Sequence, residues 1–382
     1  MFVYFDNNAT TPVDKEVADL VYKYMVSDYA NPNSIHGFGN KIEKMMEDAR
    51  ELIAEKLDAM PYEIYFTSCA SESINWAIRG ICKANFRSGK HIVSSAIEHS
   101  ATINTLKELE NDGYSVTLIK TDKSGVVDLK ELEEAIREDT ILVSIMAANN
   151  ETGTLEPVEK IGEIIKSKNK NTYFHVDAVQ AIGKIPFSIR KVNCDMASFS
   201  AHKFHGPKGV GITYKKEGIR IFPYLTGGSQ ERSMRGGTQN TAGIIGSALA
   251  MKKAYDNLED MKRIDALRHF MAEKITHMGG IIATPLDNSV PNTLAVIFEG
   301  VRADSIVSAL SDEGIFVSTS SACSSKSSSS NRVLHQMGYT EKQAQGNIRI
   351  SLSHLNNGKE VDYFLEKLKN VLNFLKFNHS GV

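Results

Sequence analysis

Short β-rich runs alternate with helical periods between residues 63 and 211, and this alternation leaves few possible folds. Seven strand candidates lie at 63–67, 91–95, 116–119, 141–145, 172–176, 196–200 and 209–214. Helix candidates between them repeat apolar residues at spacings of three and four, at 71–83, 102–111, 129–138 and 157–168. The pattern predicts an α/β fold with a doubly wound, mostly parallel seven-stranded sheet.

The remainder of the chain is typical of a smaller α+β lobe. It shows a helical run from 243 to about 277, a strand at 293–298, a helix at 303–313 and a final helix at 359–376. A chain of 382 residues exceeds what one hydrophobic core usually supports. We expect a large domain over residues 15–250, and a smaller C-terminal domain over residues 251–382 that also takes residues 1–14.

Charge and hydropathy exclude several classes of partner. The chain has 44 basic and 46 acidic side chains, so no basic surface is predicted that would attract nucleic acid. No apolar run reaches the roughly 18 residues of a membrane span, and the first residues lack the pattern of a secretory signal. We therefore expect a cytoplasmic protein whose partners are small molecules and other proteins.

Four cysteines are widely spaced, at positions 69, 82, 194 and 323, without a C-x-x-C pair. This spacing argues against a zinc site, an iron-sulfur ligand run and a disulfide framework. His202 and His205 lack a third ligand nearby, so no metal is predicted. We expect the first three cysteines to be buried, inert thiols. Cys323 lies in a serine-rich segment at about 318–330, for which we expect an exposed, mobile loop.

Several polar residues follow directly after strand candidates, where parallel α/β sheets bind ligands. Small residues at 67–73 open a helix whose free N–H groups could hold a phosphate, although an ordinary N-cap by Ser71 explains them too. His99 could stack on a heteroaromatic ring or move protons, or it could be a surface histidine. Asn150 offers a side-chain donor, and a turn formed by Asn149 and Asn150 is the alternative.

Two further strand ends carry a carboxylate and a lysine. Lys203 lies between a short apolar strand and a glycine-rich turn, where apolar surroundings would lower its pKa and make it a Schiff-base nucleophile. Asp177 follows the strand at 172–176 and could stabilise a protonated ring nitrogen, and Gln180 could donate to a ring oxygen. An amine, a carboxylate and a phosphate cup together are what pyridoxal phosphate requires.

Nine short motifs follow one another along the chain. They are YFDNNATTP at 4–12, TSCASES at 67–73, EH at 98–99, NNETG at 149–153, HVDAVQ at 175–180, SFSAHKFHGPKGVG at 198–211, RGGT at 235–238, SSAC at 320–323 and IRISL at 348–352. With these motifs the chain resembles the NifS-like cysteine desulfurases, in the class V branch of the fold type I pyridoxal-phosphate enzymes. The resemblance runs from about residue 3 to residue 375.

The resemblance implies a fold type I transferase that binds pyridoxal 5'-phosphate and forms a homodimer. It makes Lys203 the Schiff-base residue, His99 the ring-stacking imidazole and proton carrier, Asp177 the partner of the pyridine nitrogen and Gln180 the contact of the ring hydroxyl. The implied phosphate ligands are Ala70, Ser71, Ser200, His202 and, from the other subunit, Thr238.

The resemblance also implies a substrate and a nucleophile. Arg349 and Asn150, which lies beside the cofactor, would hold the carboxylate of L-cysteine, because an arginine fork binds a carboxylate bidentately. Cys323 would take the sulfur as a persulfide, with release of L-alanine. The sulfur would then pass to acceptor proteins, such as an iron-sulfur scaffold or a thiolation acceptor.

Two alternatives share part of this pattern. A selenocysteine lyase or another class V aminotransferase would share Lys203, Asp177 and His99, and Cys323 is the residue that separates them. A non-catalytic assembly scaffold would keep the fold and bind only partners. The complete set of reactive residues favours the desulfurase.

Overall fold

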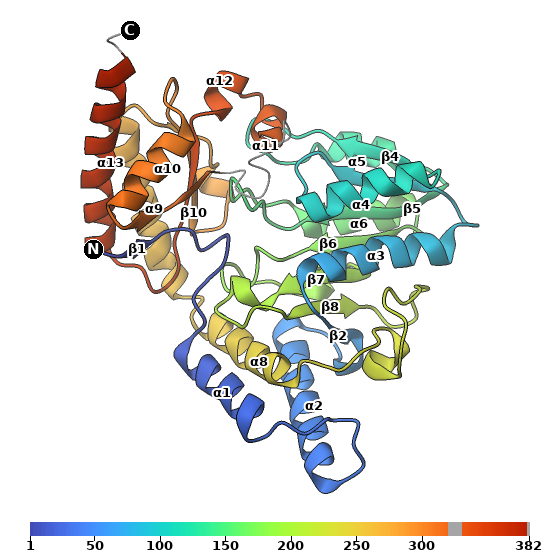
Figure 1. The fold of residues 1–382 in the computed structure, drawn as a ribbon. Coiled ribbons are helices and arrows are strands. Elements are labelled where there is room, and N and C mark those ends of the chain that lie inside the picture. The colour runs from blue at the N-terminus through green and yellow to red at the C-terminus, as the bar shows by residue number, and fades with distance from the viewer. Residues whose placement is uncertain (320–330, 380–382) are drawn as a thin grey trace.

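A seven-stranded and a four-stranded β-sheet organise the described part of the chain, which also has a two-stranded sheet (Figure 1). The computed structural model describes residues 1–319 and 331–379. The larger sheet has seven strands in the order β2-β8-β7-β6-β5-β3-β4. Their bounds are β2 Ile64–Thr67, β3 His91–Ser95, β4 Ser115–Ile119, β5 Thr140–Met146, β6 Tyr173–Asp177, β7 Met196–Ser200 and β8 Gly211–Lys215.

The larger sheet is parallel from β7 through to β4, and only β8 runs antiparallel to its two neighbours. The predicted mostly parallel seven-stranded sheet is therefore confirmed. Parallel strands place all their carboxyl ends at one edge, which is where the candidate residues converge.

Helices cover both faces of this sheet (Figure 1). Successive side chains of a strand enter opposite cores: Phe66 packs on one face and Tyr65 on the other. The first face is covered by α2 Gly37–Leu57, α5 Leu129–Ala135, α6 Val158–Lys168, α7 Ile189–Val192 and α8 Thr241–Asp256, with α1 Lys15–Val26 packed on α8. The second face is covered by α3 Ala70–Asn85 and α4 Ser100–Asn111.

The C-terminal lobe has its own sheet, in the antiparallel order β12-β13-β10-β9. Its strands are β9 Ile281–Ile282, β10 Thr293–Ile297, β12 Ser318–Thr319 and β13 Asn347–Ser351, and its helices are α9 Asp260–His277, α10 Ala303–Asp312 and α13 Gly358–His379. The chain start returns to this lobe, where β1 Val3–Tyr4 pairs with β11 Ile315–Phe316. The division of the chain at residue 250 stays a prediction.

A separate apolar cluster joins the two sheets. Met146 at the end of β5 packs in one cluster with Ala295 and Ile297 of β10. Two short helices, α11 Arg332–Gln336 and α12 Glu341–Ala344, close this cluster. The cluster holds β10 of the smaller sheet against the carboxyl end of β5.

The structure differs from the sequence-based expectations at several boundaries. The predicted single helical run over 243–277 is two helices, because the chain leaves helical geometry at residues 257–259 between α8 and α9. Asp177 is the last residue of β6 and does not follow it. Within residues 1–319 and 331–379, no helix combines the length and the apolar character that crossing a bilayer requires.

Candidate active site

A cavity of about 490 Å³ opens at the carboxyl edge of the larger sheet. Ten of the residues singled out from the sequence line it: Ala70, Ser71, His99, Asn150, Asp177, Gln180, Ser200, His202, Lys203 and Arg349. Nine of them end or follow strands of the larger sheet, whose carboxyl ends meet at this edge, and Arg349 comes from β13 of the smaller sheet. The roles assigned to these residues stay predictions, but their meeting in one cavity is a property of the fold.

Lys203 ends the single 3₁₀ turn Ala201–Lys203 that follows β7. Its Nζ donates to the backbone carbonyl of Asn8 at 2.6 Å and to that of Ala9 at 2.8 Å. The expected apolar enclosure is therefore wrong, because the amine lies against two carbonyl oxygens of the N-terminal segment. These contacts hold the amine at the cavity wall.

Asp177 is buried at the end of β6, the strand next to β7. One carboxylate oxygen accepts the N–H of Val179 at 3.0 Å. Burial raises the pKa of Asp177 to about 6, although the Val179 N–H and the Lys203 charge act in the opposite direction. A cationic N–H in the cavity would stabilise the ionised carboxylate at this position.

His99 is the N-cap of α4, and its Nδ1 accepts the N–H of Ala101 at 3.1 Å. Burial, with the positive charges of Lys203 and Arg332, lowers the pKa of His99 to about 4. The neutral ring therefore carries its proton on Nε2, because Nδ1 is an acceptor. His99 lines the cavity, so the alternative of a surface histidine is wrong.

The N-terminus of α3 faces the same cavity. The helix begins at Ala70, and its N-cap, Cys69, makes no side-chain cap hydrogen bond. The alternative that Ser71 is an ordinary N-cap is therefore wrong. The first N–H groups of a helix are suited to an anion, and the neighbouring Ser200 and His202 line the same space. This arrangement fits a phosphate group.

Arg349 on β13 supplies a buried guanidinium. Its Nη2 donates to Asp6 Oδ1 at 2.7 Å and its Nη1 donates to the carbonyl of Asn150 at 3.0 Å. Its Nε is buried without a hydrogen-bond partner among the described residues. Asn149 forms the turn through its Oδ1, which accepts from Glu151 and Thr152, and Asn150 is left to line the cavity.

The cavity lining also contains residues that were not assigned a role from the sequence, among them Asn8, Glu98, Glu151 and Arg332. Asn8 lies in the 4–12 motif. Its side-chain nitrogen donates to Thr293 Oγ1, and its Oδ1 accepts from Lys184 and Asn292. Burial raises the pKa of Glu98 to about 8 and that of Glu151 to about 7. Arg332 donates to the carbonyls of Ala96 and Glu98. The short motifs that contain Asn8, Glu98 and Glu151 could have drawn attention to them, but no sequence signal marks Arg332.

Two predicted residues are not part of this cavity. Thr238 is exposed and is absent from the cavity lining, and Cys323 lies outside the described residues. The expected burial of Cys69 is wrong, because this residue is exposed at the cavity edge, whereas its expected lack of reactivity stays a prediction. Cys82 and Cys194 are buried, and burial raises the pKa of both thiols.

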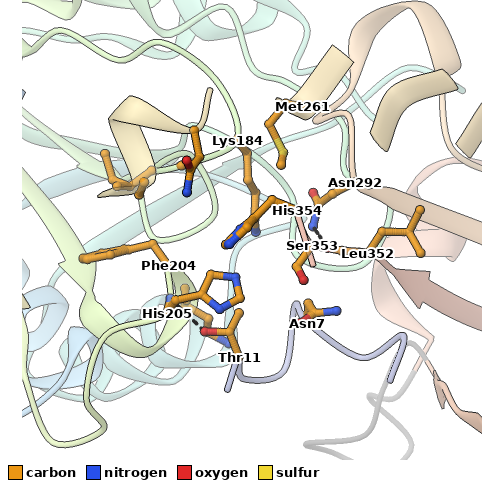
Figure 2. A pocket seen from close by; sticks show the side chains of 15 residues that line it. Asn7, Thr11, Lys184, Phe204, His205, Met261, Asn292, Leu352, Ser353 and His354 are labelled. Carbon is orange, nitrogen blue, oxygen red and sulfur yellow. Dashed lines mark hydrogen bonds between the residues drawn. The ribbon is translucent and has the colours of Figure 1, made fainter. Parts of the chain in front are cut away.

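The structure also has a much smaller cavity, of about 30 Å³ (Figure 2). Lys203 lines both cavities. Lys184, His205 and His354 are among the polar residues that surround the smaller one. A space of this size admits about one or two water molecules and excludes a cofactor.

Comparison with known proteins decides the family. Residues 3–364 match the sequence profile of the family Aminotransferase class-V. The chain belongs to the class V aminotransferase family. "Cysteine desulfurase IscS" of Methanosarcina thermophila is 43% identical over 380 residues, which cover 98% of this chain and 93% of that protein. "Cysteine desulfurase IscS" of a Clostridium botulinum strain is 40% identical, over 97% of this chain and 94% of that protein.

Solved structures agree with this assignment. A "NIFS-LIKE PROTEIN" superposes with a TM-score of 0.94 at 49% sequence identity, covering 98% of this chain and all of that one. A structure titled "SspA in complex with cysteine" superposes with a TM-score of 0.79 at 33% identity, covering 93% of this chain and 100% of that one. The expected resemblance to NifS-like enzymes of fold type I is thereby confirmed.

Proposed function

We propose that this class V enzyme is a cysteine desulfurase that uses pyridoxal 5'-phosphate to convert L-cysteine to L-alanine and passes the sulfur to Cys323. The observation that carries the proposal is the placement of Lys203, Asp177 and Arg349 around one cavity in a chain closely similar to cysteine desulfurases. The cytoplasmic location stays a prediction.

The residues around the cavity fit the cofactor. Lys203 would hold it covalently, Asp177 would pair with its ring nitrogen and the N-terminus of α3 would bind its phosphate together with Ser200 and His202. When bound, the cofactor supplies an electron sink for the charge that develops at the substrate α-carbon. Asp177 supports that role, because an ionised carboxylate keeps the ring nitrogen protonated.

The protein's own groups would then handle the substrate and its protons. The carboxylate of L-cysteine would displace Asp6 from Arg349 and form a bidentate pair with the guanidinium, with Asn150 beside it. The Lys203 amine would remove the α-proton. His99, with its proton on Nε2, would carry protons in the later steps.

Sulfur transfer is balanced without an external oxidant. The bond between Cβ and sulfur of L-cysteine breaks, and a new bond forms between that sulfur and Sγ of Cys323. Cβ takes up the electron pair and a proton, so that L-cysteine and the Cys323 thiol give L-alanine and a persulfide. We further propose a homodimer in which Thr238 completes the phosphate site of the other subunit, and an iron-sulfur scaffold or a thiolation protein as sulfur acceptor.

The test is formation of alanine and sulfide from L-cysteine by the protein loaded with pyridoxal phosphate, in the presence of a thiol reductant. The wild type is expected to form both, and Cys323→Ala is expected to keep the bound cofactor's absorbance and to lose sulfide release. Cys69→Ser is the matched control, because Cys69 is the one exposed thiol within residues 1–319 and 331–379, and this variant should keep sulfide release.

The alternatives give different results in the same assay. Unchanged turnover by Cys323→Ala with L-cysteine would contradict persulfide transfer. Turnover of selenocysteine alone would favour a selenocysteine lyase. A wild type that binds no pyridoxal phosphate and forms no alanine would favour a scaffold.

A further inference from the structure

Lys184 is a fully enclosed lysine directly behind the predicted cofactor contact Gln180. Its Nζ donates to Oε1 of Gln180 and, at 3.2 Å, to Oδ1 of Asn8. Only 7% of the residue is exposed, and Figure 2 shows its side chain among those that line the smaller cavity. The lysine therefore lies between the two cavities and contacts the amide that faces the larger one.

The backbone holds this pair together. Lys184 follows Gln180 by four residues in a tight turn, in which the N–H of Lys184 bonds the carbonyl of Ala181 at 3.1 Å. Gly183 has a φ of +74°, and a Cβ there would lie 3.0 Å from the Cβ of Ala254. Any other residue at position 183 would strain the turn, so the glycine keeps Lys184 directed at Gln180.

The surroundings of Lys184 do not suit an ordinary structural ion pair. Among the described residues, no carboxylate lies within ion-pair distance of its Nζ, and none lines the smaller cavity. Burial, followed by the positive charges of Lys203 and Arg349, holds the pKa of Lys184 well below its usual value. The amine has enough N–H donors for the two amide oxygens that it contacts, Oε1 of Gln180 and Oδ1 of Asn8.

These contacts fix which way the amide of Gln180 points. Its Oε1 accepts from Lys184, and its Nε2 donates to the backbone carbonyl of Asn8 at 3.1 Å. The reversed amide would lose the bond that Oε1 accepts from Lys184, and it would place Oε1 against the carbonyl oxygen of Asn8, where neither oxygen carries a hydrogen. An amide nitrogen has two hydrogens, so the second N–H of Gln180 remains for the larger cavity, which Gln180 lines.

We propose that Lys184 is a positioning residue that holds the amide of Gln180 with one N–H toward the cofactor. That N–H then donates to a hydrogen-bond acceptor, the ring oxygen of pyridoxal phosphate. This inference rests on the proposed function, since it names the bound group. Lys184 acts through Gln180 and does not itself reach the cofactor cavity, because it is not among the residues that line it.

The test is a double-mutant cycle on cofactor affinity. Apoprotein is titrated with pyridoxal phosphate for the wild type, Lys184→Met, Gln180→Ala and the double variant, by cofactor absorbance and by quenching of Trp76, the single tryptophan. Methionine fills the same space without a donor. Lys184→Met should raise the dissociation constant about 3- to 10-fold in the wild-type background, the equivalent of one hydrogen bond.

The background variant separates positioning from a general structural effect. With Gln180 already replaced by alanine, Lys184→Met should change the dissociation constant by less than about twofold, because its target is gone. An equal rise in the dissociation constant in both backgrounds would overturn the inference, since it would mean that Lys184 acts through Asn8 or through stability alone. An unchanged dissociation constant in both backgrounds would overturn the inference as well.

A matched control uses the other buried lysine of this part of the fold. Lys215 on β8 is also largely buried and lies outside both cavity linings, so Lys215→Met should leave the dissociation constant within about twofold of the wild type. A comparable loss of affinity for pyridoxal phosphate in Lys215→Met would contradict a specific role for Lys184. A wild type that takes up no pyridoxal phosphate would instead refute the proposed function, so the two failures are distinguishable.

Discussion

Replacement of Asp177 by asparagine should separate what this carboxyl does for stability from what it does for activity. Burial raises the pKa of Asp177 from 3.8 to about 6, so the ionised carboxylate is disfavoured in the folded protein without cofactor. The difference between the two pKa values corresponds to about 3 kcal/mol in the free energy of unfolding. Asparagine keeps the acceptor for the Val179 N–H and cannot ionise.

The sign of the effect follows from the raised pKa. Below about pH 4 the carboxyl is protonated in both the folded and the unfolded state, so it contributes no pH-dependent loss of stability. Between pH 4 and 6 the unfolded chain ionises first, and the wild-type apoprotein loses stability relative to Asp177→Asn. Above about pH 6 the variant should be more stable by about 3 kcal/mol.

The assay is urea unfolding of both apoproteins between pH 4 and pH 8, with desulfurase turnover measured in parallel on the loaded proteins. Turnover by Asp177→Asn should fall by at least about a hundredfold, because the group that keeps the ring nitrogen protonated is lost. A stability difference that does not change with pH, or a wild type that is the more stable protein at pH 8, would contradict a raised pKa of Asp177 in the folded apoprotein.

Glu156→Gln is the matched control for this experiment. Glu156 is buried outside the cavity lining, and burial raises its pKa to about 8. As the pH rises, Glu156→Gln should also become more stable than the wild type. Its turnover should stay within about twofold of the wild type, because this carboxyl does not reach the reacting atoms.

Three other predictions follow from the same geometry. Borohydride should fix pyridoxal phosphate to the wild type but not to Lys203→Ala, and a reducible bond retained in that variant would move the assignment to another lysine. Arg349→Lys should raise KM for L-cysteine about 10- to 100-fold, because one charge-assisted hydrogen bond is lost, and an unchanged KM would contradict carboxylate binding there. Arg50→Met should lower the free energy of unfolding in urea by about 3–5 kcal/mol, because the Glu231 carboxylate would stay buried without its positively charged partner. Arg50 contacts this carboxylate at 2.9 Å, and a loss below about 1 kcal/mol would contradict a buried ion pair at this position.

Much of the fold could be predicted from periodicity alone. The seven strands of the larger sheet were expected at nearly their observed positions, because buried parallel strands are short apolar runs with clear ends. Periodicity could not place the break between α8 and α9, since both helices bury apolar faces and residues 257–259 carry no glycine or proline. The two-residue strands β1 and β11 were missed because pairing across the chain, and not local sequence, defines them.

The site was partly predictable for a similar reason. Asp177, His99 and Lys203 end or follow strands, so the rule for parallel sheets brings them together without knowledge of side-chain contacts. The surroundings of Lys203 were not predictable, because its partners are carbonyls nearly 200 positions away in the chain. The role proposed for Lys184 was not predictable from the sequence either, because it depends on the orientation of the side-chain amide of Gln180.

The most direct test of the proposed desulfurase is mass analysis of peptides after incubation of the loaded protein with L-cysteine. We expect an added mass of about 32 daltons, one sulfur atom, on the peptide that contains Cys323. The peptides of Cys69, Cys82 and Cys194 should remain unchanged. Alanine formation with no added sulfur on Cys323, or with the sulfur on Cys69 instead, would contradict the central claim.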